Sequence, residues 1–299
     1  MVTIDPKEIS VAHLHAYMLS AIAPRPIAFA STVNKDGHAN LSPFSFFNAF
    51  GSNPPTLIFS PARRVRDNTT KHTLENILEV PEVVINTVNY DMVRQTSLSS
   101  VEFPKGVNEF AKAGFTAVPS ERIKPFCVKE SPVQFECKVV EVKSMGDQGG
   151  AANLVICEIL LMHISEQVLN EQSRIDQHKI DLVARLGGDY YVRASGNALF
   201  EVEKPNTKPA IGIDQLPPEI RLSKVLTGNN LGQLGNAEHL PRIEELTAIH
   251  LSEQLNDLKE RFHNDAESLE YHRHLLAKEF LEEGNVMAAW KILLLKLTD

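Results

Sequence analysis

A succession of short β-rich segments separated by turn residues constrains this fold more than any other feature of the chain. Such segments occur at residues 27–33, 38–42, 56–60, 83–88, 133–142 and 153–164. The turn Asn34-Lys35-Asp36-Gly37 joins the first pair, and its Asp-Gly end is a strong hairpin signal because a tight turn needs a positive φ there. No glycine-rich dinucleotide motif or P-loop motif follows a strand. The pattern predicts a mainly β fold, an antiparallel barrel with a few inserted helices, rather than alternating βαβ units.

One inserted helix is predicted between residues 69 and 80. Thr69 or Thr70 would cap its start, and Leu74, Ile77 and Leu78 would share one face. Pro81 would prevent it from continuing.

The composition changes near Glu203, where prolines, glycines and asparagines become frequent as far as Asn236. We interpret this stretch as a turn-rich connector, and its length suggests a segment laid over another surface. After Pro241, apolar residues at helical spacing predict two or three amphipathic helices, the last of which contains the only tryptophan, Trp290. We therefore expect one domain over residues 1–205, followed by a connector and a helical C-terminal extension over residues 206–299. The extension would cover apolar surface or widen a dimer interface, or it would act as a lid; Leu-rich stripes favour packing.

Charge and composition exclude several classes of function. The net charge of −8 argues against nucleic-acid binding, which needs a concentrated basic face. No apolar run approaches the length of a membrane helix, and the N-terminus lacks the apolar core of a signal peptide. Three widely spaced cysteines suit a reducing compartment, so we expect a cytoplasmic protein with no membrane partner. The histidines and cysteines show no ligand spacing, and we expect no metal site.

A cationic loop precedes the predicted helix. Arg63, Arg64, Arg66 and Lys71 fall close together in a chain that is acidic overall. A helix N-terminus presents unpaired N–H groups and a partial positive charge, so this loop is a candidate phosphate site. The alternative is a solvated charged turn.

The segment Asn40–Asn48 combines short polar side chains with three phenylalanines. Ser42, Ser45 and Asn48 offer donors and acceptors, and the phenylalanines offer flat apolar surface, as a flat hydrogen-bonding ligand would need. The alternative is a core segment in which the phenylalanines pack and the serines satisfy a turn.

Taken in order, these blocks resemble the flavin reductase-like family of FMN-binding split barrels. The matching segments are Arg25-Pro26-Ile27 with Ser31-Thr32, Asn40-x-Ser42-Pro43-Phe44-Ser45-x-Phe47-Asn48, Lys71-x-Thr73-x-x-Asn76 and Arg185-Leu186-Gly187-Gly188-Asp189-Tyr190-Tyr191. The resemblance covers about residues 10–200. It implies an antiparallel split β-barrel that binds FMN, with NAD(P)H as co-substrate, in a homodimer whose flavins lie near the subunit boundary.

The resemblance also implies a set of cofactor-binding residues. Ser31, Thr32 and the segment Asn40–Asn48 would line the ring and ribityl groups, while Ser60, Arg64, Lys71 and Thr73 would surround the phosphate. His72 stands where family members commonly carry Asp. The full set is Ser31, Thr32, Asn40, Ser42, Ser45, Phe46, Phe47, Asn48, Ser60, Arg64, Lys71, His72 and Thr73. The family supplies no dedicated catalytic proton donor, which agrees with direct hydride transfer between aligned cofactors.

Three functions follow as hypotheses. The first is an FMN-binding oxidoreductase that uses NAD(P)H and passes electrons to free flavin, a small acceptor or a partner protein. The second is an electron carrier that binds FMN without NAD(P)H activity of its own. The third is an interaction protein in which the helical extension docks a partner and the barrel is a scaffold.

Overall fold

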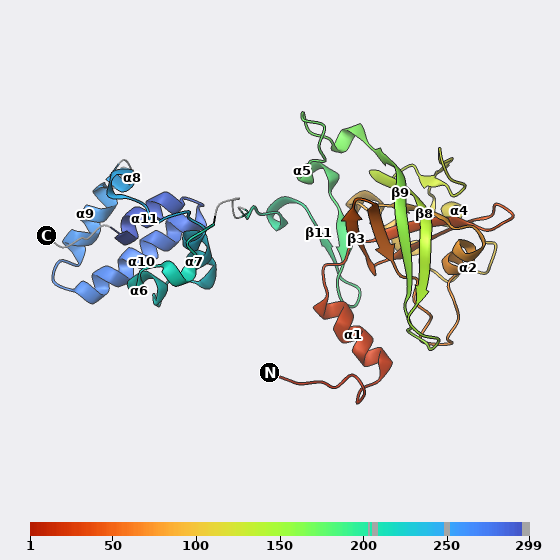
Figure 1. Cartoon of the computed structure of the whole chain (residues 1–299), viewed down its shortest axis with the longest axis horizontal. Coiled ribbons are helices and arrows are strands. Elements are labelled where there is room, and N and C mark those ends of the chain that lie inside the picture. The colour runs from red at the N-terminus through yellow and green to blue at the C-terminus, as the bar shows by residue number, and fades with distance from the viewer. Residues whose placement is uncertain (203, 205–208, 248–251, 295–299) are drawn as a thin grey trace. The chain divides into compact units, whose positions relative to one another are not determined.

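A computed structural model describes residues 1–202, 204, 209–247 and 252–294 of the chain. The chain divides into two compact units, Met1–Phe200 and Glu201–Asp299 (Figure 1). Each has a hydrophobic core of its own, and each is described separately below.

Within the described part of the first unit, seven strands form one antiparallel sheet in the order β2-β1-β5-β8-β9-β4-β3. Its strands are β1 (Ala28–Val33), β2 (Ala39–Phe44), β3 (Phe47–Ser52), β4 (Pro55–Phe59), β5 (Glu82–Asn86), β8 (Val133–Ser144) and β9 (Asn153–Ile164). The predicted strands are therefore present, and β3 is a strand that the sequence analysis did not predict. Two small two-stranded sheets pair β6 (Ala117–Val118) with β7 (Cys127–Val128), and β10 (Val183–Arg185) with β11 (Tyr191–Arg193).

The predicted hairpin joins β1 to β2. Gly37 has a φ of +84°, the conformation for which glycine is suited. Asn34 receives the N–H of His38 on its side-chain oxygen at 2.9 Å and also pairs with the carbonyl of His38 through its own N–H. The Asp-Gly signal thus identified the turn correctly.

The sheet curls but does not close. Only Ser45 and Phe46 separate β2 from β3 in the chain, yet these strands occupy opposite edges of the sheet. The edges must therefore approach each other, as in a barrel. Among the described residues no ladder pairs β2 with β3, and β3 pairs with β4 alone. The antiparallel sheet expected from the sequence is confirmed, whereas a closed barrel is not formed.

Apolar side chains pack on both faces of β1. Ala28 and Ala30 belong to the cluster inside the curled sheet, which also includes Phe59 and Ile85. Phe29 points to the opposite face. Burial on both sides explains why the sequence of this strand is almost continuously apolar.

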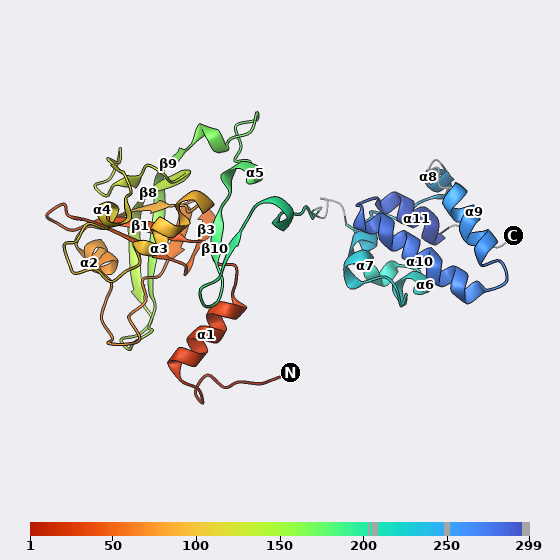
Figure 2. The ribbon, with the colours of Figure 1, turned by 180° about the vertical axis from the view of Figure 1, so that it is seen from behind.

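Several helices cover or extend the sheet (Figure 2). They are α1 (Val11–Ala21), α2 (His72–Glu79), α3 (Val93–Leu98), α4 (Glu109–Ala113) and α5 (Gln177–Ile180), with short 3-10 turns at Tyr90–Met92, Glu166–Val168 and Gly196–Ala198. Helix α2 packs Leu74 and Ile77 inward as predicted, whereas Leu78, which was expected on the same face, is 68% exposed. The N-cap of this helix is Lys71 rather than Thr69 or Thr70. The predicted cap is wrong because both threonine hydroxyls are engaged elsewhere, with Asp67 and Glu75.

Helix α1 is held beside the β10–β11 hairpin rather than on the large sheet (Figures 1 and 2). Arg25 is 5% exposed, and its guanidinium donates to the carbonyls of Leu19, Ile22 and Leu186. Ser20 lies so close to Gly187 that a side chain at 187 would collide with it. Arg25 therefore has a structural role that joins two distant segments.

The second unit is helical. Its helices are α6 (Pro218–Arg221), α7 (Gly228–Gly235), α8 (Ile243–Thr247), α9 (Ser252–Arg261), α10 (Ala266–Glu282) and α11 (Val286–Leu294), with a 3-10 turn at Ile213–Gln215. No helix in the described ranges is long and apolar enough to cross a membrane.

The stretch interpreted as a connector belongs to this helical unit. Thr227 and Asn230 form a capping box at the start of α7, and Ile220 and Leu234 are fully buried. They pack in one cluster with Trp290 of α11. The interpretation as a segment laid over another surface was wrong for residues 209–236, because their apolar side chains build the core of the second unit.

Candidate functional site

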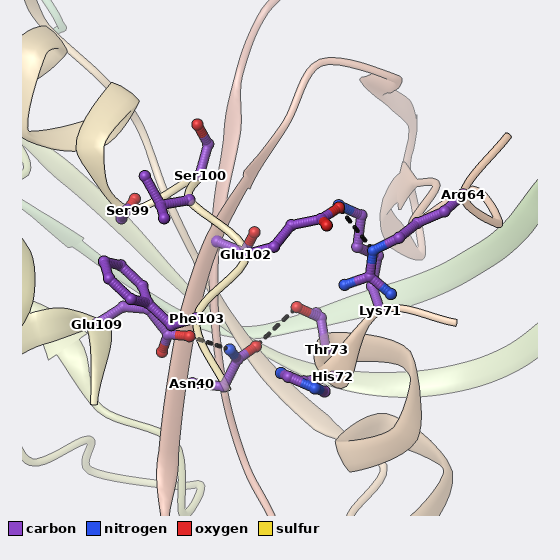
Figure 3. A pocket seen from close by; sticks show the side chains of 12 residues that line it. Asn40, Arg64, Lys71, His72, Thr73, Ser99, Ser100, Glu102, Phe103 and Glu109 are labelled. Atoms are coloured by element: carbon purple, nitrogen blue, oxygen red, sulfur yellow. Dashed lines mark hydrogen bonds and ion pairs between the residues drawn. The ribbon is translucent and has the colours of Figure 1, made fainter. Parts of the chain in front are cut away.

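A polar pocket lies where the start of α2 meets β2 and the loop that follows α3 (Figure 3). Its lining combines cations, carboxylates and hydroxyls: Asn40, Ser42, Arg64, Lys71, His72, Thr73, Ser99, Ser100, Val101, Glu102, Phe103 and Glu109. The pocket therefore gathers the cationic loop and part of the Asn40–Asn48 segment, which are distant in the sequence.

The side chains of Arg64, Arg66 and Lys71 converge on one carboxylate, Glu102. Arg64 Nε lies 2.7 Å from Glu102 Oε1, and an Arg66 guanidinium nitrogen lies 2.7 Å from Oε2. Lys71 Nζ lies 3.5 Å from Oε1. Hydrogen bonds from Arg64 and Arg66 lower the pKa of Glu102 to about 2, so it is ionised at neutral pH. Figure 3 shows Glu102 reaching from its loop towards Arg64 and Lys71.

The loop holds Arg64 in place independently of Glu102. Arg64 also donates to the hydroxyl of Thr69 at 2.9 Å and to the carbonyl of Thr70. Arg63 does not line the pocket and donates to the side-chain oxygen of Asn68 at 2.6 Å. Of these neighbouring arginines, Arg64 is directed to the pocket and Arg63 stabilises the loop.

Lys71 occupies the N-cap position of α2, which makes no side-chain cap hydrogen bond within the described structure. Burial and the nearby charge of Arg64 lower the pKa of Lys71, while Glu102 opposes this effect. The partial positive charge of a helix N-terminus adds to the cationic side chains. The pocket is thus built to bind an anion.

A buried network forms the floor of the pocket. Thr73 donates its hydroxyl to Asn40 Oδ1 at 2.8 Å, and Asn40 Nδ2 donates to Glu109 Oε1 at 2.9 Å. Glu109 also accepts the N–H of Leu41 at 3.1 Å. Burial raises the pKa of Glu109, although these hydrogen bonds oppose the shift. Because its amide oxygen pairs with Thr73 and its amide nitrogen with Glu109, Asn40 positions β2 against α2.

His72 stands between this pocket and a neighbouring cavity. That cavity is also lined by Asn34, His38, Asn76 and Lys105. Its wall is basic and polar, and the unusual histidine at position 72 contributes to both spaces.

The structure brings only part of the predicted site together. Asn40, Ser42, Arg64, Lys71, His72 and Thr73 line the pocket, whereas Ser31, Thr32, Ser45, Phe46, Phe47, Asn48 and Ser60 do not. Ser31 and Thr32 are fully buried in β1; among the described residues Ser31 Oγ has no partner, and Thr32 accepts from Asn76 at 3.1 Å. Ser60 is buried and accepts the N–H of Asn153 at 3.2 Å.

The other predicted residues lie in or near β3. Ser45 Oγ lies 3.5 Å from Arg25 Nε, and the ring of Phe46 meets His15 of α1 edge-on at 6.0 Å. Phe47 packs partly against the core, and Asn48 is exposed.

Sequence reasoning missed the acidic residues of the pocket. Glu102 and Glu109 lie on segments without a motif, and Ser99 and Ser100 accompany Glu102 on the loop after α3. The excess of cations at residues 63–71 could have signalled that an acidic partner was needed, but not which one.

The cysteines and the Glu136–His163 pair lie outside the pocket lining. Cys137 and Cys157 are free and buried in the sheet, and burial raises the pKa of Cys157 to about 12. The ligating atoms of Cys127, Glu136 and His163 lie within 4.8 Å of one another. Hydrogen bonds account for the positions of Glu136 and His163, because Glu136 accepts two backbone N–H groups and contacts His163 Nε2 at 2.7 Å. Cys127 Sγ lies 3.6 Å from the hydroxyl of Ser120.

Comparisons with known proteins point to one family. The family model described as the flavin reductase like domain matches residues 19–179. An uncharacterized protein of Aquifex aeolicus is 37% identical over 196 residues, which cover 66% of this chain and 97% of that protein.

Solved structures agree on the fold. Nitrilotriacetate monooxygenase component B from Bacillus cereus is 28% identical with a TM-score of 0.63, covering 68% of this chain and 98% of that one. A Shewanella frigidimarina protein described as a flavin reductase with a split barrel domain is 24% identical with a TM-score of 0.57, covering 68% of this chain and 100% of that one. At that identity the second structure shows the fold alone.

Proposed function

The chain belongs to the flavin reductase like domain family, and we propose that its Met1–Phe200 unit binds FMN and uses NAD(P)H to reduce it. The observation that carries this proposal is the convergence of Arg64, Arg66 and Lys71 on a single anionic group at the start of α2. A phosphorylated flavin would place its phosphate on the same donors.

The residues present fit a phosphate group. A phosphate monoester carries about −1.5 to −2 charges and strong acceptor oxygens at neutral pH, which favour charge-assisted hydrogen bonds from arginine and lysine. Arg64 and Lys71 supply these donors, and Arg64 is already oriented by Thr69 and Thr70. Thr73 would support the same subsite indirectly, because its hydroxyl donates to Asn40 and so holds the first turn of α2 in place.

The adjoining segment would meet the rest of the cofactor. Ser42 faces the pocket from β2, and the chain runs from there through Ser45 and Phe46 into β3. We assign the ring and ribityl groups to this segment because it adjoins the anion site and mixes polar with aromatic side chains. The buried network of Thr73, Asn40 and Glu109 would keep this segment in a fixed orientation relative to α2.

Bound FMN would supply the redox chemistry, which is hydride uptake from NAD(P)H followed by electron transfer to free flavin, a small acceptor or a partner protein. The role of the protein is to bind and align the reactants and to exclude water. No residue is assigned as a catalytic acid or base. Cofactor position is therefore the property that the pocket residues control.

We also propose that the protein is a cytoplasmic homodimer. Tyr17 and Ile22 at α1 are 56% and 62% exposed, and Phe50 on the edge strand β3 is 64% exposed. A second copy could cover these apolar side chains. Light scattering on the full chain tests the dimer, and a monomer at micromolar concentration would contradict it.

Cofactor binding is tested directly with protein purified from flavin-replete cells. The expected result is a visible flavin spectrum, or a melting temperature that rises with added FMN because a ligand that binds the native state stabilises it. A colourless protein whose melting temperature does not respond to FMN would refute the proposal.

A further inference from the structure

Glu102 occupies the position at which the pocket offers its best anion donors. Its Oε1 lies 2.7 Å from Arg64 Nε, and its Oε2 lies 2.7 Å from an Arg66 guanidinium nitrogen. Lys71 Nζ lies 3.5 Å from Oε1. Figure 3 shows this carboxylate directed towards Arg64 and Lys71. The protein thus carries its own anion at the place assigned above to a phosphate.

We propose that Glu102 is an internal competitor of the flavin phosphate, so that FMN must displace it to bind and remains exchangeable rather than permanently held. This inference rests on the proposed function, because it assigns the same cluster to the phosphate. It identifies Glu102 as the residue that sets how strongly the site prefers a phosphorylated flavin to an unphosphorylated one.

Competition follows from the chemistry of the donors. A guanidinium N–H that already donates to a carboxylate is not available to a phosphate, and two anions on one cationic cluster repel each other. FMN would therefore lose part of the free energy that Arg64, Arg66 and Lys71 could contribute. Riboflavin has no phosphate and would leave Glu102 in place.

The local structure allows the exchange. The Glu102 side chain is 40% exposed, so it can rotate into water without burying its charge. The backbone of its loop is supported separately, because Ser99 and Ser100 donate their hydroxyls to the carbonyls of Thr96 and Ser97 at 2.8 and 2.6 Å. Rotation of the Glu102 side chain alone would therefore free the cations for a phosphate.

Arg64 would stay in position when the Glu102 side chain moves away. Arg64 keeps its hydrogen bonds to Thr69 and Thr70 when Glu102 leaves. The donors would therefore be ready for a phosphate.

The test compares Glu102→Gln with the wild-type chain in titrations with FMN and with riboflavin. Glutamine keeps the size of the side chain and removes its charge. We expect the Kd for FMN to fall about fivefold to tenfold, as loss of a partly exposed charge pair would allow, with the Kd for riboflavin unchanged. FMN should also dissociate more slowly from the variant.

Two further variants separate the mechanism from general charge effects. Glu141→Gln removes the same charge from an exposed position on β8 outside the pocket lining. It should leave the Kd for FMN and the Kd for riboflavin unchanged. Glu102→Asp keeps the charge and should retain weaker FMN binding than Glu102→Gln. Equal tightening by Glu141→Gln, or equal tightening towards riboflavin, would overturn the inference.

The remaining outcomes distinguish this inference from the proposed function. If wild type and Glu102→Gln bind FMN equally well, the competition is refuted and flavin binding stands. If neither protein binds FMN or riboflavin, the proposed function fails and the inference fails with it.

Inorganic phosphate provides a second measurement that needs no flavin. It should raise the melting temperature of Glu102→Gln more than that of wild type, because the free cations then gain an anion. An equal rise in both proteins would contradict the competition.

Discussion

The hydroxyl of Thr73 donates to Oδ1 of Asn40 over 2.8 Å and so joins the first turn of α2 to strand β2. Both residues were expected from the sequence to contact the cofactor, and both line the pocket. Their mutual hydrogen bond gives them an architectural role as well. It fixes the distance between the cationic helix start and the strand that leads into the Ser/Phe segment.

Replacing Thr73 with Val tests this connection. Thr73 is 1% exposed, so the variant would leave Asn40 Oδ1 buried without its donor, at a cost of about 1–3 kcal/mol in the free energy of unfolding. Thr73→Ser keeps the hydroxyl and should recover most of that loss. Urea denaturation measures both variants, and equal stability of Thr73→Val and wild type would argue against the role given to this bond.

Lys71→Ala and Arg64→Ala test the phosphate assignment. Each removes one charge-assisted donor, so the Kd for FMN should rise about tenfold to a hundredfold while that for riboflavin changes little. Lys35→Ala, on the exposed turn between β1 and β2, is the matched control and should have no effect. Equal losses of FMN and riboflavin affinity would place the phosphate elsewhere.

Glu136 provides a prediction about pH. Burial raises its pKa, but hydrogen bonds from the Glu121 N–H, His163 and the Arg122 N–H outweigh this and leave the pKa below its ordinary value of 4.5. A carboxyl whose pKa is lowered by folding stabilises the folded state when it is ionised. The contribution of Glu136 to the free energy of unfolding is therefore complete above pH 4.5, and it is lost as the pH falls through the lower pKa of the folded state.

The pH prediction is checked by melting wild type and Glu136→Gln from pH 7 to pH 3. The variant should melt at a lower temperature at neutral pH, because its amide group faces N–H donors. The difference in melting temperature between the two proteins should stay constant down to about pH 4.5 and narrow below it. A gap that widens on acidification would contradict the assigned direction of the pKa.

Leu281→Ala tests the independent core of the helical unit. Leu281 is fully buried in the same cluster as Trp290, so its truncation should cost about 2–5 kcal/mol in the stability of that unit. Fluorescence of Trp290, the only tryptophan, reports on this unit alone. FMN affinity should not change, because the pocket lining lies between residues 40 and 109. A coupled loss of affinity would contradict that separation.

Local patterns predicted the strands well and the pocket only in part. Alternating and β-branched segments set the strands, and the Asp-Gly pair set the turn at Gly37. Strand β3 was missed because its sequence, Phe47-Asn48-Ala49-Phe50-Gly51-Ser52, has no clean alternation, and every residue after Phe47 is exposed. Its identity as a strand depends on pairing with β4, which only the tertiary structure reveals.

In the site, too, features set by the local sequence could be predicted and those set by tertiary structure could not. The cations at Arg64 and Lys71 could be recognised because they are close together in the sequence. Glu102 and Glu109 could not, because the chain returns to the pocket through the loop after α3 and the start of α4, whose sequences carry no motif. The second unit was misjudged at residues 209–236, where frequent glycine and proline concealed apolar positions such as Ile220 and Leu234 that pack over a long range.

Anaerobic mixing of the FMN-loaded protein with NADH and with NADPH tests the proposed reductase activity most directly. We expect the visible absorbance of the bound flavin to bleach with at least one of the two, and to return when an electron acceptor is added. A flavin spectrum that neither nucleotide changes would contradict the reductase and identify the protein as an FMN-binding carrier.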